Sequence, residues 1–123
     1  MRLGWIGLFL GLTTIALSGA AYADDYGASA AGISGSKVGV GYSVNFSTQA
    51  AADAKAIQEC EMQTSNCQIV GRFWNGGCGY ITTAASDGTC YGYGDSPATA
   101  TNECQSGGCG ACQTPIGACT KER

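Results

Sequence analysis

The chain of 123 residues contains no histidine. Histidine is the most frequent general base of enzymes and the commonest metal ligand in proteins. A Ser–His–Asp or Cys–His catalytic centre is therefore excluded. Any catalytic or metal chemistry has to come from carboxylates or cysteines.

Basic residues are few as well. Six lysines and arginines stand against nine acidic residues, which gives a formal net charge of −3. A surface that binds nucleic acid needs clustered Lys and Arg, whereas the basic residues here are scattered along the chain. We therefore expect no nucleic-acid partner. The Gly-rich stretches around Gly39 and Gly92 also lack the Lys or Rossmann pattern of a phosphate-binding loop.

Large apolar side chains are scarce, whereas glycine occurs 20 times and cysteine eight times. So small a core needs covalent support. An even number of cysteines behind an export signal is typical of a disulfide framework in an oxidising compartment. The cysteines are Cys60, Cys67, Cys78, Cys90, Cys104, Cys109, Cys112 and Cys119.

Residues 1–23 have the pattern of a signal peptide. Arg2 provides the positive start, residues 3–17 are apolar, and residues 21–23 (AYA) form a small-x-small cleavage site. The apolar run is short for a membrane span, so we expect no stable membrane anchor after cleavage. Residues 24–123 then form a single domain that is periplasmic or secreted. A short uncleaved anchor is the alternative.

The first half of the chain predicts the order strand, strand, helix, strand. The strands are expected at residues 26–33, 37–44 and 68–74, and the helix is capped by Ser47 or Thr48 and ends at Cys60. Helical spacing places Ala50, Ala54, Ile57 and Cys60 or Glu61 on the apolar face of this helix. Residues 75–77 (NGG) then form a turn.

The same order then restarts. We expect strands at residues 79–85 and 89–94 with a turn at residues 87–88, a helix from Ser96-Pro97 to Cys104, and a last strand between Cys109 and Cys119. Gly41-Tyr42 matches Gly92-Tyr93, and Glu59-Cys60 matches Glu103-Cys104. We interpret residues 26–77 and 78–119 as two repeats. The predicted fold is a small disulfide-rich α+β domain, in which two β-hairpin–helix–strand repeats form an antiparallel sheet with helices packed on it.

The repeat also predicts the disulfide bonds. Cys60–Cys67 and Cys104–Cys109 would tie the helix end to the next strand in each repeat. Cys78–Cys119 would join the ends of the two repeats, and Cys90–Cys112 would pin strands inside the second repeat.

A family resemblance rests on the order Gly-Tyr-Ser, an Ala-rich helix ending in Cys, an apolar strand, and residues 73–79 (FWNGGCG). In this order the chain resembles the secreted bacterial family catalogued as domain of unknown function 4189, over Tyr26 to Cys119. The resemblance implies export and a compact α+β domain, and it implies no established reaction or catalytic residue. This sequence departs from the family in its short second helix and in Cys90 with Cys112, which form an added pair.

The cysteines allow two alternatives to a structural role. Residues 109–112 are a CxxC motif, which would be a redox site in a thioredoxin-like βαβ setting. No such setting surrounds the motif, so structural disulfides are favoured. The spacing of Cys104, Cys109, Cys112 and Cys119 also permits zinc, but oxidation after export competes with thiolate ligation. We therefore expect no metal and no cofactor.

Glu59 and Glu103 occupy matched positions and are the candidate carboxylate pair for glycoside hydrolysis. Each lies on a polar helix face, which is usually just solvated, so we expect no catalytic residues. Trp74, Tyr91 and Tyr93 are the candidate binding surface for a protein or a glycan, and packing into the core is the alternative for each.

These patterns lead us to expect a non-enzymatic, exported binding module that disulfides hold rigid. Its partner would be a protein of the envelope or the extracellular space, and its role that of an inhibitor or immunity-type protein for an enzyme there. The alternatives are a small periplasmic enzyme, either a carboxylate-based hydrolase or a thiol redox enzyme, and a structural envelope protein.

Overall fold

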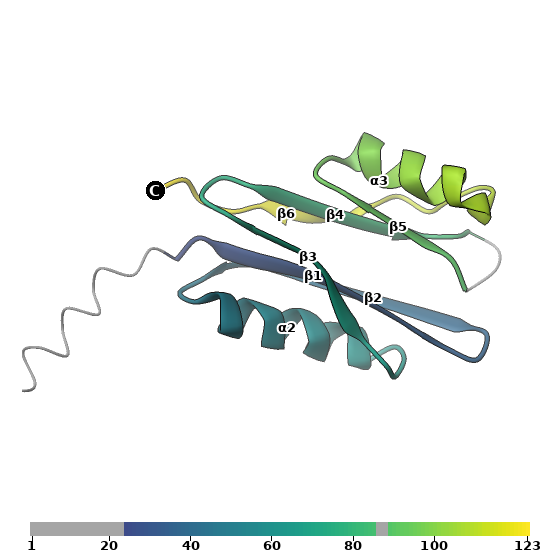
Figure 1. The fold of residues 1–123 in the computed structure, drawn as a ribbon, viewed down its shortest axis with the longest axis horizontal. Coiled ribbons are helices and arrows are strands. Elements are labelled where there is room, and N and C mark those ends of the chain that lie inside the picture. The colour runs from purple at the N-terminus through teal and green to yellow at the C-terminus, as the bar shows by residue number, and fades with distance from the viewer. Residues whose placement is uncertain (1–23, 86–88) are drawn as a thin grey trace, which may run out of the picture.

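The computed structural model describes residues 24–85 and 89–123, and Figure 1 shows their course. The predicted signal peptide and the predicted turn at residues 87–88 lie outside the described residues. The elements are β1 (Tyr26–Ser34), β2 (Lys37–Phe46), α2 (Gln49–Glu61), β3 (Gln68–Trp74), β4 (Cys78–Thr83), β5 (Tyr91–Gly94), α3 (Pro97–Cys104), a π-helical turn (Gln105–Cys109) and β6 (Ile116–Cys119).

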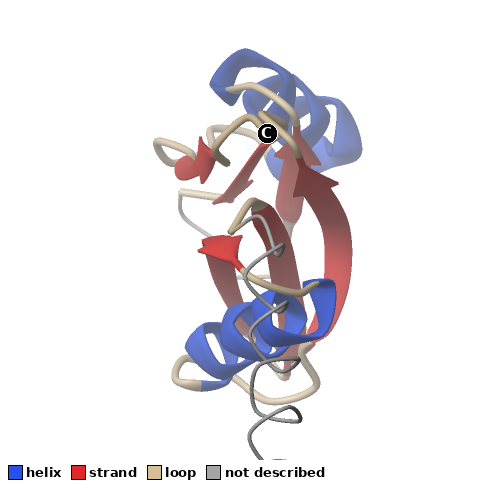
Figure 2. Cartoon of the chain, turned by 90° about the vertical axis from the view of Figure 1, so that its left-hand side faces the viewer, coloured by secondary structure: helices blue, strands red, loops and turns tan. Residues whose placement is uncertain are grey.

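The six strands form two antiparallel sheets, with the strand orders β2-β1-β3 and β5-β4-β6. In each sheet the first strand is central, its hairpin partner lies on one side, and the strand after the helix lies on the other. The helices α2 and α3 cover the outer faces, and the two sheets lie between them (Figure 1 and Figure 2). The α+β class is confirmed, but the strands divide into two sheets where the sequence analysis expects one. An origin of the two halves by duplication stays a prediction.

Both helices begin with the caps that the sequence predicts. The Thr48 hydroxyl accepts a hydrogen bond from the Ala51 N–H at 3.1 Å. The Ser96 hydroxyl accepts one from the Thr99 N–H at 3.1 Å, and Pro97 stands in the first turn of α3. These caps satisfy backbone donors that have no partner within the helix. Among the described residues, no helix is long and apolar enough to cross a membrane.

The predicted apolar face of α2 is wrong at Ala50 and Ala54, but Ile57 packs against the core as predicted. Ala50 and Ala54 are exposed, whereas Ala52, Ala56 and Cys60 are fully buried. The buried residues are four apart and therefore lie on one side of the helix. Alanine occurs on both sides of α2, so hydrophobicity alone does not distinguish the two faces. The disulfide at Cys60 and the glycines of β2 decide which side packs on the sheet.

Glycines of β2 and β5 let the helices approach their sheets closely. A Cβ atom on Gly41 would collide with the backbone oxygen of Ala56 in α2. A Cβ atom on Gly92 would meet the backbone oxygen of Ala100 in α3 in the same way. Gly41 and Gly92 therefore occupy equivalent places, which fixes the correspondence between the two halves.

Four disulfides join all eight cysteines, and two of them are the predicted bonds. Cys60–Cys67 ties the end of α2 to the start of β3. Cys78–Cys119 joins two residues that are directly paired between β4 and β6. The predicted bonds Cys104–Cys109 and Cys90–Cys112 are wrong, because the structure instead contains Cys90–Cys109 and Cys104–Cys112.

The π-helical turn explains the exchanged partners. It extends α3 as far as a kink at Gly108 (φ 89°), so the chain first comes alongside the second sheet at Cys112, which forms an isolated bridge with Ala84. Cys112 is thus the structural counterpart of Cys67, since each is the cysteine between a helix and the next strand. Spacing in the sequence favours Cys109, the nearer cysteine, as the partner of Cys104. It does not show that helical structure extends beyond Cys104.

Polar contacts join the two ends of the described chain. The buried carboxylate of Asp25 accepts a hydrogen bond from the Asn75 N–H at 2.7 Å and forms an ion pair with Arg123 at 2.8 Å. The guanidinium of Arg123 also donates to the Tyr26 hydroxyl at 3.1 Å. These contacts hold the turn between β3 and β4, which borders the candidate site described next.

Candidate functional site

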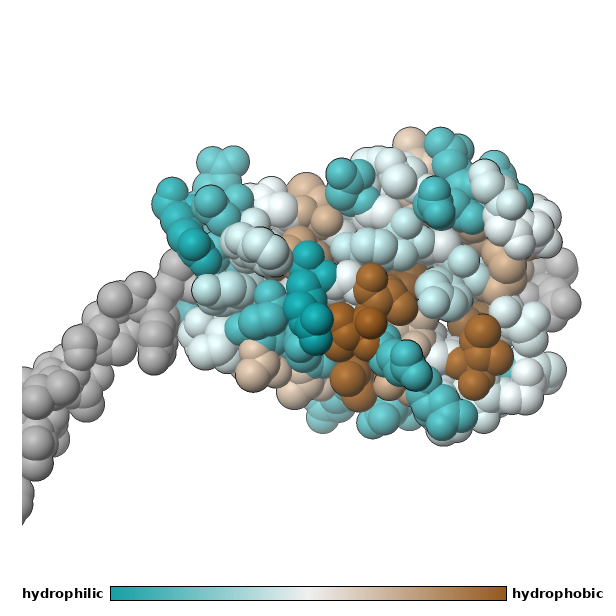
Figure 3. Space-filling view, in the orientation of Figure 1, coloured by the Kyte–Doolittle hydropathy of each residue, from teal (hydrophilic) through white to brown (hydrophobic). Residues whose placement is uncertain are grey.

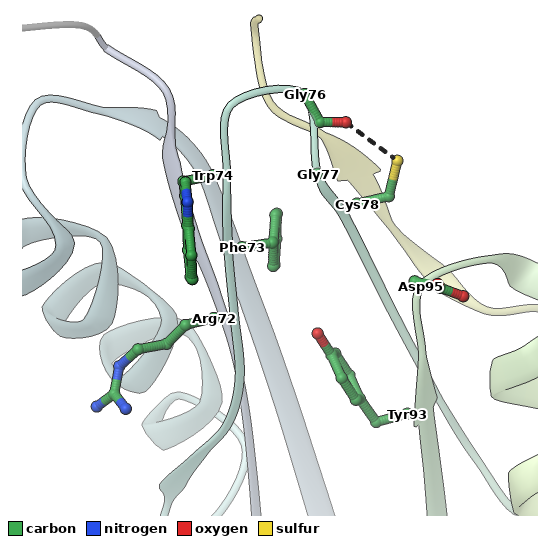
Figure 4. A pocket seen from close by; sticks show the side chains of 8 residues that line it. All are labelled: Arg72, Phe73, Trp74, Gly76, Gly77, Cys78, Tyr93 and Asp95. Atoms are coloured by element: carbon green, nitrogen blue, oxygen red, sulfur yellow. Dashed lines mark hydrogen bonds between the residues drawn. The ribbon is translucent and has the colours of Figure 1, made fainter.

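A groove of about 490 Å³ opens where the end of β3 approaches β5 (Figure 4). These are edge strands of different sheets, so the groove lies between two strand edges without a partner strand in the described part of the chain. We call it the aromatic groove. Its lining includes Arg72, Phe73, Trp74, Tyr93 and Asp95.

Strand alternation directs Phe73 and Trp74 to opposite sides of β3, as Figure 4 shows. Phe73 is 5% exposed, and its ring occupies space left by Gly27 and Gly79, where a Cβ atom would overlap it. Trp74 is 52% exposed. Tryptophan is enriched among the residues that dominate binding energies, so an open tryptophan at the rim of a groove indicates a contact residue.

Tyr93 reaches from β5 toward β3, where its ring lies against Gly71. A side chain at position 71 would overlap the ring, so glycine makes this approach possible. Burial and, to a smaller extent, the negative charge of Asp95 raise the pKa of Tyr93 above its ordinary value. The hydroxyl is therefore protonated at neutral pH and can donate a hydrogen bond into the groove.

Arg72 extends away from Tyr93 toward α2 (Figure 4). Its Nε and Nη2 atoms donate to the Asp53 carboxylate at distances between 2.9 and 3.2 Å. This two-point contact pairs the positive charge of Arg72 with the negative charge of Asp53. Asp95 has no ion-pair partner within the described ranges, so the groove combines aromatic rings with one uncompensated negative charge.

A family model with the description "Domain of unknown function (DUF4189)" matches residues 26–119, which run from the start of β1 to the end of β6. The chain belongs to this family. No curated protein and no solved structure matches it. The DUF4189 match therefore covers both sheets and both helices, and it assigns no reaction.

In this DUF4189 domain, Trp74 and Tyr93 both line the aromatic groove, with Trp74 on the side of β3 that faces away from Tyr93 (Figure 4), whereas Tyr91 does not line it. Tyr91 borders a second hollow of about 270 Å³ farther along β3 and β5, together with Ile33 and Val70. Figure 3 shows apolar residues gathered near the middle of the face seen in Figure 1, with polar residues around them. The predicted binding surface is thus divided between two neighbouring hollows.

The charged part of the groove is not indicated by the sequence. Asp95 stands between the strand ending at Gly94 and the cap at Ser96, a position typical of a loop residue. Arg72 belongs to a strand, and its pairing with Asp53 joins residues from two different elements. Arg72 is a neighbour of Trp74 within β3, whereas only the approach of β5 to β3 brings Asp95 to the same groove, and no local pattern indicates that approach.

The candidate carboxylates of the DUF4189 domain do not come together. Glu59 forms an ion pair with Lys55 at 3.1 Å on the surface of α2. Glu103 is exposed on α3, which lies on the opposite side of both sheets (Figure 1). A glycosidase needs its two carboxyl groups within roughly 10 Å of each other. Glu59 and Glu103 therefore do not form such a centre.

The four cysteines considered for zinc are all in disulfides. The sulfur atoms of Cys104, Cys109 and Cys112 lie within 4.8 Å of one another, whereas Cys119 is bonded to Cys78. Thiolate, not disulfide, is the form of cysteine that binds metal. In this oxidised state the sulfur cluster cannot act as a thiolate site.

Proposed function

We propose that this DUF4189 protein is an exported binding module that holds a protein partner at the aromatic groove. The observation that carries the proposal is Trp74, 52% exposed at the rim of a groove that also contains Tyr93 and Asp95. Four disulfides support export to an oxidising compartment. They also hold the groove in shape before binding, which lowers the entropy lost on association.

The groove suits a protein better than a glycan. A sugar presents many hydroxyls, which call for several free hydrogen-bonding side chains around an aromatic face. The Nε and Nη2 atoms of Arg72 are already bonded to Asp53, which reduces the number of donors that the groove offers to a sugar. A protein segment needs an apolar side chain for Trp74 and Tyr93 and a Lys or Arg for Asp95. The free edges of β3 and β5 add backbone donors and acceptors.

The same features support an inhibitor or immunity-type role toward an envelope or extracellular enzyme. Such a protein acts through a rigid complementary surface and requires no chemistry of its own. The absence of histidine and the separation of Glu59 from Glu103 favour action by binding rather than by catalysis.

Site-specific photocrosslinking tests the proposal. A photoreactive amino acid replaces Trp74 in one variant and Met62 in the other. Met62 is 76% exposed at the end of α2 and serves as the matched control. We expect one envelope protein to be captured from position 74 and not from position 62. With that partner purified, Trp74→Ala should weaken binding at least about tenfold, and Met62→Ala less than twofold.

Asp95→Asn should also weaken binding, and it should reduce the dependence of affinity on salt, since it removes the unpaired charge. Equal affinity of Trp74→Ala and the unmodified protein would contradict the proposed site. Binding to glycans that depends on Trp74, without any captured protein, would overturn the assignment of the partner class.

A further inference from the structure

We propose that Cys90, Cys104, Cys109 and Cys112 form a thiol–disulfide exchange site. In this proposal, reduction of Cys90–Cys109 allows Cys109 to displace Cys112 from its bond with Cys104. The inference is independent of the aromatic groove.

The first support is the distance between sulfurs. The two bonds Cys90–Cys109 and Cys104–Cys112 are neighbours, because the sulfurs of Cys104, Cys109 and Cys112 all lie within 4.8 Å of one another. Exchange proceeds by attack of a thiolate on a disulfide sulfur. Once Cys109 is released from Cys90, a disulfide is already within reach of its sulfur.

The second support comes from comparing the two halves. The equivalence of Gly41 and Gly92 makes Cys90, which directly precedes β5, correspond to Gly39 in β2. The first half therefore forms the same strand–helix–strand unit with Cys60–Cys67 as its single internal disulfide. Cys104–Cys112 is the counterpart of that bond. Cys90–Cys109 is additional, so the fold of the second half does not depend on it.

The third support is the loose packing of the chain around Cys109. The residues of the π-helical turn before Cys109 are exposed. A Cβ atom on Gly107, Gly108 or Gly110 would meet nothing within 4 Å. The backbone can therefore adjust by the small distance that a change of sulfur partner requires, without disturbing the sheets.

Two electrons and two protons enter at the Cys90–Cys109 bond. A dithiol, either a small molecule or a reduced CxxC oxidoreductase, gives two electrons and two protons to Cys90–Cys109 and becomes a disulfide. The Cys109 thiol loses its proton to solvent, and its sulfur bonds to the sulfur of Cys104. The bond from Cys104 to Cys112 breaks, and the leaving Cys112 thiolate takes up a proton.

Attack at Cys104 is favoured over attack at Cys112 because of the leaving group. Cys112 is partly exposed, so water can solvate its thiolate, whereas Cys104 is fully buried and would leave a charge in an apolar setting. The product retains a tie between the end of α3 and the chain that follows. It also places a free thiol at Cys112, which is able to form a mixed disulfide with a partner.

The variant Cys90→Ser tests the exchange without reductant, because it leaves Cys109 unpaired in the folded protein. The folded Cys90→Ser protein is alkylated without denaturant, and its peptides are then mapped under non-reducing conditions. We expect the label on both Cys109 and Cys112, with at least about one tenth on Cys112. That fraction corresponds to exchange isomers within about 1.4 kcal/mol of each other. Label confined to Cys109 overturns the proposal.

The double variant Cys90→Ser/Cys109→Ser is the control. It should fold and keep Cys104–Cys112, and failure to fold would refute the claim that the additional bond is dispensable. Partial reduction of the unmodified protein gives an independent readout. We expect Cys90 and Cys112 to be alkylated together with a new Cys104–Cys109 bond. Alkylation of Cys90 and Cys109 with Cys104–Cys112 intact would contradict the exchange.

Discussion

Gly41→Ala tests directly how closely α2 packs on the first sheet. The new Cβ atom would collide with the backbone oxygen of Ala56, and it would lie 2.6 Å from the nitrogen of Cys60 and 2.8 Å from the Cβ atom of Glu59. Backbone atoms of a helix cannot rotate away as the end of a long side chain does. The helix as a whole has to move outward, and its buried alanines then lose contact with the sheet.

The expected cost follows from two opposing effects. Overpacking of a well-packed interface typically costs about 1–3 kcal/mol, and the rigid backbone contacts at Gly41 place this site at the upper end. Replacing glycine by alanine also restricts the unfolded chain, which stabilises the fold by about 0.4–1 kcal/mol. We expect a net loss of about 2 kcal/mol. In a domain of this size that loss lowers Tm by about 8–16 °C.

Denaturant unfolding followed by circular dichroism, with the disulfides intact, measures this effect. Gly92→Ala should show a similar loss, since it meets α3 as Gly41 meets α2. Gly107→Ala is the matched control, because its Cβ atom would meet nothing within 4 Å, and its stability should change by less than about 0.5 kcal/mol. If Gly41→Ala proves as stable as Gly107→Ala, the close seating of α2 is wrong.

Three further predictions concern the disulfides, the chain ends and pH. Loop-closure entropy predicts that replacing both cysteines of Cys78–Cys119 by alanine lowers the free energy of unfolding by about 4 kcal/mol, and that replacing those of Cys60–Cys67 lowers it by about 2.5 kcal/mol. Equal losses in denaturant unfolding would contradict this ranking. Asp25→Asn should lower stability by about 1–2 kcal/mol, because it removes a buried carboxylate that binds a half-exposed arginine, and an unchanged unfolding midpoint would refute that role. Because the pKa of Tyr93 is raised in the fold, its contribution to stability is intact below about pH 10 and is lost as pH rises through that region. Asp95→Asn should move the tyrosinate absorbance of this residue to lower pH, and an unmoved titration would exclude the influence of Asp95.

Local chemistry made much of the architecture predictable. The caps at Thr48 and Ser96 and the proline after Ser96 define where both helices begin, because they satisfy backbone donors within a few residues. The match of Gly41 to Gly92 is also readable from the sequence. It reflects a packing requirement that is the same in each half.

Features that depend on contacts between distant segments were not predictable. The choice between the two sides of α2 depends on the sheet beneath it, and the cysteine pairing in the second half depends on a π-helical turn that spacing does not reveal. The candidate site shows the same limit. Trp74 and Tyr93 are recognisable as aromatic candidates, but Asp95 joins them only through the approach of β5 to β3.

The meeting of Asp25 and Arg123 has a practical consequence for handling the protein. The β3–β4 turn beside the aromatic groove also contacts these chain ends, since Asn75 bonds both Asp25 and Arg123. An affinity tag or fusion partner joined beside Asp25 or Arg123 would therefore lie next to this turn. The β1–β2 hairpin lies at the other end of the molecule (Figure 1), and a Cβ atom on Gly35 at its turn would meet nothing within 4 Å. Immobilisation through a circular permutant with new ends at Gly35 would leave the groove facing the solution.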